Sequence, residues 1–208
     1  MAITIESTKL LAVEGKDECN FFDTLLKKNL SINDVQIINI GGIDKFPMSF
    51  DALCNTEGFY KINRIGFIRD AELNPAKSAF DSIKGVIINK LPTPTKAGDI
   101  NKSNNPWVGI FIMPDNSNAG TLEHLCIDSI KLLPLNYCIE NYIKCIKKHH
   151  DPTEQTKFKE NKAHVLSYLA SQCKSKFVNT LGLAAQQGYW NFNNTCFENI
   201  KNFLKNLF

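Results

Sequence analysis

Six acidic residues are predicted near one edge of a sheet, at or after the ends of stretches that the sequence predicts to be buried strands. They are Glu14, Glu18, Asp70, Glu72, Asp115 and Glu123, and all except Asp115 are expected to hold metal. Carboxylates that converge repel one another, and a bound divalent cation is the usual way in which a protein makes such a cluster tolerable. Oxygen ligands without a convergent histidine or cysteine favour Mg²⁺ or Mn²⁺ over Zn²⁺. A magnesium ion held by carboxylates is suited to phosphoryl transfer on nucleic acids.

The first strand and helix show how such acids are positioned. Leu10–Val13 is a short apolar run typical of a fully buried strand, and a helical pattern begins shortly after it. Gly15 permits a tight turn between the two. Glu14 is therefore predicted at the carboxyl end of the strand, where open α/β sheets hold their chemistry. Glu18 is predicted on the first turn of the helix, where the helix dipole favours a carboxylate.

The same alternation of strand and helix continues along the chain. Further buried strands are predicted over residues 35–40, 63–68 and 107–113, the last of them closed by Asp115. Helices are predicted over residues 46–53, 74–83, 121–130, 137–148, 154–174 and 195–207. The expected fold class is α/β, with a small mainly parallel sheet flanked by helices. We expect an α/β domain over residues 1–135 and a helical extension over 136–208, packed on the same core.

Composition excludes several classes of protein. The 208 residues are 43% hydrophobic, yet they contain no apolar run of about 18 residues and no basic start followed by an apolar segment. We therefore expect neither a membrane span nor a signal peptide, and a cytoplasmic location. Seven cysteines without CxxC spacing fit reduced thiols better than disulfides or a zinc site. Cys126, Cys138 and Cys145 are expected to be small core residues.

Positive charge is concentrated in one segment. Residues 144–176 hold eight lysines and three acidic residues, a net charge of +5, whereas residues 1–143 hold 14 basic and 17 acidic residues, a net charge of −3. The basic segment is either a solvated helix face or a surface that follows phosphates beside the acidic site. On the second interpretation, nucleic acid would contact Lys16, Lys147, Lys148, Lys157 and Lys159.

Two further features leave alternatives open. The loop over residues 90–106 is the longest irregular segment, and loops of this length are usually functional or mobile. Tyr189 and Trp190 either stack on a nucleic-acid base or seal the core beneath the last helix, and burial of aromatic area favours the second role.

The acidic motifs carry a family resemblance. VEGKDE at Val13–Glu18, followed by the acid pair of Asp70-Ala71-Glu72, resembles the Toprim domain of topoisomerases, DnaG-type primases and overcoming-lysogenization-defect (OLD) nucleases. MPDNSNAGTLEHL at 113–125, Lys162-Ala163 and GYWNF at 188–192 resemble a small group of stand-alone bacterial Toprim proteins. The resemblance implies a Toprim (Rossmann-like) sheet that binds Mg²⁺ and acts on phosphodiesters.

The resemblance also implies a role for each acid. Glu14 matches a strand-end glutamate that binds metal and serves as general acid or base, and Glu18 matches an acid of the nuclease branch. Asp70 and Glu72 match the acid pair, although its usual second member is aspartate, and the extra methylene of Glu72 could move a metal by about 1 Å. Glu123 resembles a late glutamate used for a second metal.

Lys162 leaves two interpretations open. It either takes the part of the active-site lysine of those nucleases, which stabilises negative charge in the transition state, or is one more solvated lysine.

The function expected from these residues is metal-dependent phosphodiester hydrolysis on DNA or RNA. Glu14, Asp70 and Glu72 would hold one ion and Glu18 and Glu123 a second. Topoisomerase and primase activities are disfavoured, because we expect neither a domain that presents a tyrosine nor a zinc module. The main alternative is a catalytically silent Toprim module that binds nucleic acid or regulates a partner such as an ATPase. A receiver domain fits less well, because Glu14-Gly15 does not supply paired acids after the first strand.

Overall fold

The computed structural model describes residues 4–151, 153, 157–173 and 177–208. Its centre is a five-stranded sheet with the order β2-β1-β3-β5-β4. The strands are β1 (Lys9–Val13), β2 (Val35–Asn39), β3 (Arg64–Asp70), β4 (Ile100–Asn101) and β5 (Trp107–Met113). β1 pairs in parallel with β2 and β3, β3 pairs in parallel with β5, and the short edge strand β4 is antiparallel to β5.

The three central strands are nearly continuous apolar runs because helices cover both faces of the sheet. Successive side chains of a strand point to opposite faces. Leu11 and Val13 accordingly belong to one layer of the core, and Leu10 and Ala12 to the other. The parallel register pairs Ala12 with Phe67 and Asp70 with Met113. The carboxyl ends of β1, β3 and β5 therefore open at the same edge.

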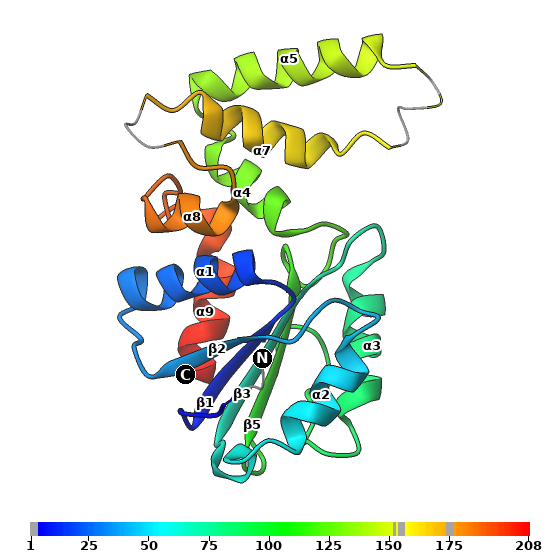
Figure 1. Ribbon diagram of the computed structural model, residues 1–208, viewed down its shortest axis with the longest axis vertical. Coiled ribbons are helices and arrows are strands. Elements are labelled where there is room, and N and C mark those ends of the chain that lie inside the picture. The colour runs from blue at the N-terminus through cyan, green and yellow to red at the C-terminus, as the bar shows by residue number, and fades with distance from the viewer. Residues whose placement is uncertain (1–3, 152, 154–156, 174–176) are drawn as a thin grey trace.

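Different helices build the two layers. α2 (Phe46–Cys54) and α3 (Ala76–Ile87) cover one face of the sheet, while α1 (Lys16–Thr24), its π-helical continuation Leu25–Asn29 and α9 (Glu198–Leu207) cover the other (Figure 1). α9 lies close to β5, because a Cβ atom at Gly109 would stand 2.8 Å from the ring of Phe203. α4 (Leu122–Ile130) and α8 (Leu181–Gln186) complete the second layer.

A helical hairpin stands beyond the carboxyl edge of the sheet. It consists of α5 (Pro134–His149) and α7 (Glu160–Ala170), and it lies above α4 in Figure 1. Buried His164 of α7 lies 2.7 Å through Nε2 from Oδ1 of Asn136 on α5. Asn161 of α7 places its side-chain amide 2.9 Å from Nε2 of His124 on α4. The hairpin is thus tied to the helix that begins at the carboxyl edge.

The α/β fold with a mainly parallel sheet is confirmed, and several details differ. The 90–106 loop contains β4, and α8 was not predicted. The helix expected over 154–174 begins at Glu160 and ends at Ala170, with residues 154–156 and 174 outside the described part. Cys126 is buried, but Cys138 and Cys145 are exposed, so the prediction for those two was wrong. The domain boundary near residue 135 stays a prediction. Among the described residues, no helix has both the length and the apolar character that a membrane span requires.

Candidate functional site

Asp70 is the last residue of β3 and lies at the centre of the acidic cluster. Its Oδ1 accepts a hydrogen bond of 3.0 Å from the backbone N–H of Leu122, the first residue of α4. Burial raises the pKa of Asp70 well above its usual value, and the negative charges of its neighbours raise that pKa further. Those neighbours are Glu14, Glu123, Glu18 and Glu72. Asp70 therefore lies among carboxylates, and the N-terminus of α4 orients it.

Glu14 follows β1 and forms an ion pair with Arg69. The distance from Arg69 Nε to Glu14 Oε1 is 2.9 Å, and the arginine is only 8% exposed. Burial raises the pKa of Glu14, the positive charge of Arg69 opposes that rise, and the charges of Glu72 and Glu18 add to it. The net direction is upward, so the cluster as a whole disfavours a charged Glu14 even with its arginine partner.

Glu18 lies on the first turn of α1 and folds back over the preceding turn. A Cβ atom at Gly15 would stand 2.4 Å from Glu18 Oε2, so any side chain at position 15 would displace the Glu18 carboxylate. Burial raises the pKa of Glu18; its own backbone N–H lowers that pKa, and the charges of Asp17 and Glu123 raise it. Glu18 thus links the acids of the first strand and helix to Glu123 on α4.

Glu72 is exposed and is held by its backbone. It has a positive φ of 58° and exchanges two backbone hydrogen bonds with Gly120, of 2.9 and 2.8 Å. This isolated bridge joins the loop after β3 to the loop before α4. The helix itself is capped by Thr121, whose N–H lies 3.0 Å from Nδ1 of His124. Glu72 and Glu123 are therefore positioned from two segments that are fixed to each other.

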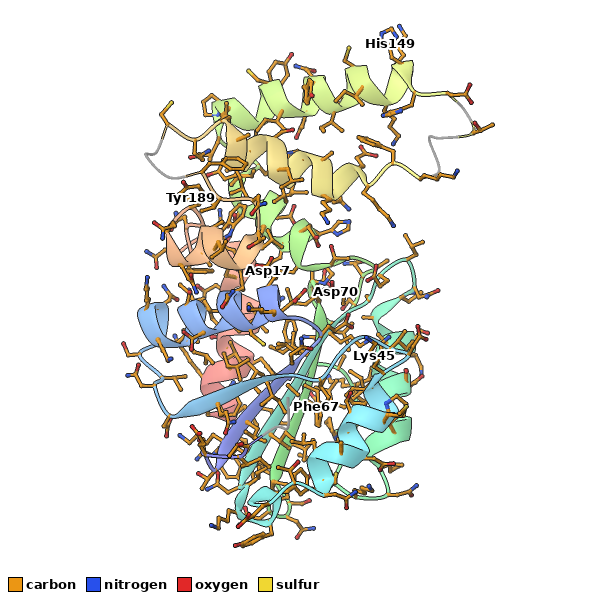
Figure 2. The ribbon with its side chains drawn as sticks, in the orientation of Figure 1. Asp17, Lys45, Phe67, Asp70, His149 and Tyr189 are labelled. Atoms are coloured by element: carbon orange, nitrogen blue, oxygen red, sulfur yellow. The ribbon has the colours of Figure 1, made fainter. Side chains whose placement is uncertain are left out.

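The structure brings five of the six predicted acids together at one edge of the sheet, all except Asp115. Glu14, Glu18 and Asp70 line one small pocket together with Arg69 and the first residue of α4. Figure 2 shows Asp70 at the carboxyl end of its strand, below α4. In the described part of the chain, no group of three or more His, Cys, Asp or Glu side chains is arranged to hold a metal ion as it stands.

The chemistry of this donor set nevertheless fits a divalent cation. All five acids supply oxygen, and the raised pKa values of Glu14, Glu18 and Asp70 reflect burial first and then neighbouring negative charge, which a cation would relieve. One oxygen of Glu14 is in contact with Arg69. Coordination would require rotation of side chains, and an ion bound at Glu14 would lie beside the charge of Arg69. Metal binding by these residues stays a prediction.

The predicted lysines lie outside the lining of the pocket that Glu14, Glu18 and Asp70 share. Lys16 is exposed at the start of α1, beside the acids. Lys162 is exposed on α7, next to the residue that contacts His124 on α4. The other four are also exposed: Lys147 and Lys148 lie on α5, and Lys157 and Lys159 lie in the segment before α7. Lys147 pairs with Glu160. Figure 2 places neighbouring His149 at the far end of the hairpin from Asp70.

Two other predicted features have structural roles. Asp115 accepts hydrogen bonds within its own turn from the backbone N–H groups of Ser117 and Asn118 and from the side-chain amide of Asn118. Burial raises the pKa of Asp115, but these hydrogen bonds lower it by more, so the net direction is downward. It therefore takes no part in the cluster. Trp190 is 3% exposed, stacks on Tyr168 and donates to the carbonyl of Leu181, as expected of a residue that seals the core.

Sequence reasoning missed Arg69. The only signal was a basic residue after the apolar run of residues 65–68, directly before the acid pair.

Sequence reasoning also missed a cleft lined by residues that follow β3 and β5. This cleft has a volume of about 460 Å³ and lies between the start of α3, the loop before β4 and the turn after β5. Its lining includes Lys77, Phe80, Lys96, Asn116 and Ser117.

Comparisons with known proteins complete the description. A comparison with curated proteins returned no match. Two solved structures of the C-terminal region of the Xanthomonas campestris pv. campestris OLD protein are similar to this chain, each with 14% sequence identity over 96% of this chain. The alignments cover 95% and 93% of those chains, with TM-scores of 0.42 and 0.41. A family model described as "Protein of unknown function (DUF3226)" matches residues 8–208, and the chain belongs to that family.

Proposed function

We propose that this protein is a metal-dependent phosphodiester hydrolase of the Toprim type, a nuclease acting on DNA or RNA. The observation that carries the proposal is the convergence of five acids, from two strand ends and two helix starts, at one edge of a mainly parallel sheet. The VEGKDE motif and the acid pair supply the resemblance to Toprim domains. Clustered oxygen donors without a convergent histidine or cysteine favour Mg²⁺ or Mn²⁺ as the cofactor.

Each acid has a distinct part in this proposal. Glu14, Asp70 and Glu72 would hold one cation, and Glu18 and Glu123 a second. When bound, such ions activate water and stabilise the charge of the leaving oxygen. The N–H of Leu122 fixes Oδ1 of Asp70, which leaves the second oxygen available. The raised pKa of Glu14 makes it a stronger base than an ordinary carboxylate, which suits it to accept a proton.

The surroundings offer places for the substrate. The cleft of about 460 Å³ has the size of a small-molecule site and is large enough for one nucleotide. Lys77 forms an ion pair with Asp81, whereas Lys96 has no acidic partner among the residues described. We assign Lys96 to a phosphate beside the scissile one. Lys16, Lys162 and the lysines of the hairpin would contact the strand farther out.

Cleavage assays with matched variants test the proposal. Purified protein is incubated with labelled DNA and RNA oligonucleotides in Mg²⁺, in Mn²⁺ or in EDTA. We expect metal-dependent cleavage by the wild type and by Asp115→Asn, because Asp115 follows a strand but lies outside the cluster. Glu14→Gln and Asp70→Asn should be inactive. Cleavage that persists in both variants would indicate a contaminant, and the proposal would then have no support.

One observation favours a second candidate, a silent Toprim module that acts with a partner such as an ATPase. Arg69 occupies an oxygen of Glu14, and Glu72 stands where aspartate is usual. A protein of this kind would bind oligonucleotides without cleaving them in any of the metals. Binding without cleavage by the wild type, unchanged in Glu14→Gln, would therefore select this alternative over the nuclease.

A further inference from the structure

Arg69 is a buried cation in contact with the acidic cluster. It is 8% exposed and lies on β3 directly before Asp70. Its charge is among the largest effects on the pKa of Glu14, whereas the other charges that act strongly on Glu14, Glu18 and Asp70 are acidic. Arg69 is therefore a buried positive charge at the edge of a cluster of five carboxylates.

The contact between Arg69 and Glu14 is close but poorly directed. Nε lies 2.9 Å from Oε1 of Glu14, yet within the described residues the buried Nε–H has no acceptor in line with it. The other side-chain hydrogen bond of the guanidinium, from NH1 to Oγ of Ser82, is long at 3.4 Å. Strong arginine–carboxylate pairs are usually bidentate, with two aligned N–H donors. Charge, rather than a network of directed hydrogen bonds, holds Arg69 in place.

The position of Arg69 conflicts with metal coordination by Glu14. The guanidinium lies at Oε1 of Glu14, so a divalent cation bound to this carboxylate would lie close to it, and the two positive groups would repel each other. Without a cation, however, the cluster needs Arg69, because an uncompensated buried charge is strongly destabilising. The two states of the site therefore require opposite arrangements of this one pair.

We infer that Arg69 is an internal counter-ion that occupies Glu14 in the cation-free protein and is displaced from it when a divalent cation binds. The inference rests on the proposed cation site but not on nuclease activity. Arg69 acts here as a positioning residue that sets the affinity for the cation and keeps the cation-free protein folded. Its loss should weaken the fold in the absence of metal and strengthen metal binding.

Calorimetric titration with Mn²⁺ and thermal denaturation test the inference without any substrate. Arg69→Met removes the charge and keeps an apolar side chain of similar length. We expect a lower Tm in EDTA, a larger rise in Tm on addition of Mn²⁺, and a Kd for Mn²⁺ reduced at least about tenfold. A charge within about 4–6 Å changes a pKa by about 1–3 units, and an effect of the same kind is expected on cation binding.

Two control variants separate charge from packing. Arg69→Lys keeps the charge and should bind Mn²⁺ with an affinity close to that of the wild type. Lys201→Met removes another buried cation, 7% exposed and paired with Glu198 on α9. It should lower Tm equally in EDTA and in Mn²⁺. If Arg69→Met is unfolded in EDTA, Mn²⁺ should restore the fold, and no such rescue is expected for an unfolded Lys201→Met.

Several results would overturn the inference. The first is an affinity of Arg69→Met for Mn²⁺ that is equal to or weaker than that of the wild type. The second is a failure of Mn²⁺ to restore the fold of an unfolded Arg69→Met. The third is a gain in Mn²⁺ affinity in Arg69→Lys equal to that in Arg69→Met. Glu14→Gln shows whether the bound ion is at this site, because it should abolish the tight component. A protein that binds Mn²⁺ in the expected pattern but cleaves nothing supports the inference and refutes only the nuclease. A protein that cleaves nucleic acid, but whose Mn²⁺ binding does not change when Arg69 is replaced, refutes the inference and supports the nuclease.

Discussion

Replacement of Asp70 by asparagine should stabilise the cation-free protein at neutral pH. The pKa of Asp70 is raised by burial and by four neighbouring carboxylates. A carboxyl group with a raised pKa in the folded state binds its proton more tightly there than in the unfolded chain. Its contribution to the free energy of unfolding is therefore present at low pH. That contribution is lost as the pH rises from the pKa of the unfolded chain through the pKa of the folded state. Asparagine removes the charge that causes this loss.

The size of the effect follows from the same linkage. Each unit by which the pKa is raised costs about 1.4 kcal/mol of stability once the pH exceeds the folded pKa. Asparagine keeps an oxygen that can accept the N–H of Leu122, so the cap of α4 is preserved. We therefore expect the free energy of unfolding at pH 7 to be higher for Asp70→Asn than for the wild type. For a chain of 208 residues, each 1 kcal/mol of such a gain corresponds to roughly 2–4 °C in Tm.

Urea and thermal unfolding, followed by circular dichroism in EDTA at pH 4.5 and at pH 7, measure this effect. The advantage of Asp70→Asn should be large at pH 7 and smaller at pH 4.5. Asp115→Asn is the matched control: the pKa of Asp115 is lowered, so its replacement should bring no gain at pH 7. An Asp70→Asn protein less stable than the wild type at pH 7 in EDTA would refute the electrostatic reasoning. In saturating Mg²⁺ the order should reverse, because a ligand stabilises only the protein that binds it.

Three further predictions concern the surroundings of the acids. Gly15→Ala should displace Glu18, because its Oε2 would stand 2.4 Å from the new Cβ. Calorimetry should then show weaker Mn²⁺ binding, while the free energy of unfolding changes by less than about 1 kcal/mol. An unchanged Kd for Mn²⁺ would contradict this prediction. Lys96→Glu, made in the inactive Glu14→Gln protein, should lower its affinity for a single-stranded oligonucleotide severalfold, as measured by fluorescence anisotropy at low salt. Lys148→Glu in the same background should lower that affinity less. Equal losses in the two variants would contradict this prediction and place the strand on the hairpin instead. Trp190→Ala should lower the free energy of unfolding in urea by about 3–5 kcal/mol while the folded protein keeps its affinity for the oligonucleotide, and a loss of that affinity would support base stacking.

The central strands could be predicted because their signal is local. β1, β3 and β5 are buried on both faces and read as continuous apolar runs, so their carboxyl ends and the acids beside them follow from the sequence. β4 could not be predicted, because Ile100 and Asn101 are too short a run and their pairing depends on β5. α8 has only six residues, and its first N–H groups are held by Asp17, more than 160 positions earlier.

The errors at individual side chains also have physical causes. Arg69 is visible in the sequence, but its partner lies on another strand and depends on the order of the sheet. Cys138 and Cys145 were expected in the core because they recur among apolar residues. α5 stands away from the sheet, however, and buries only a narrow stripe formed by Asn136, Ile139 and Ile143. A helix in a two-layer core would have buried a broader face.

The bridge between Glu72 and Gly120 has a mechanical consequence. Gly120 is followed by Thr121, which caps α4 together with His124, and His124 in turn contacts Asn161 on the hairpin. A displacement of the hairpin would therefore be transmitted through these hydrogen bonds to the backbone of Glu72. A partner protein that binds α5 and α7 would in this way change the position of an acid of the cluster.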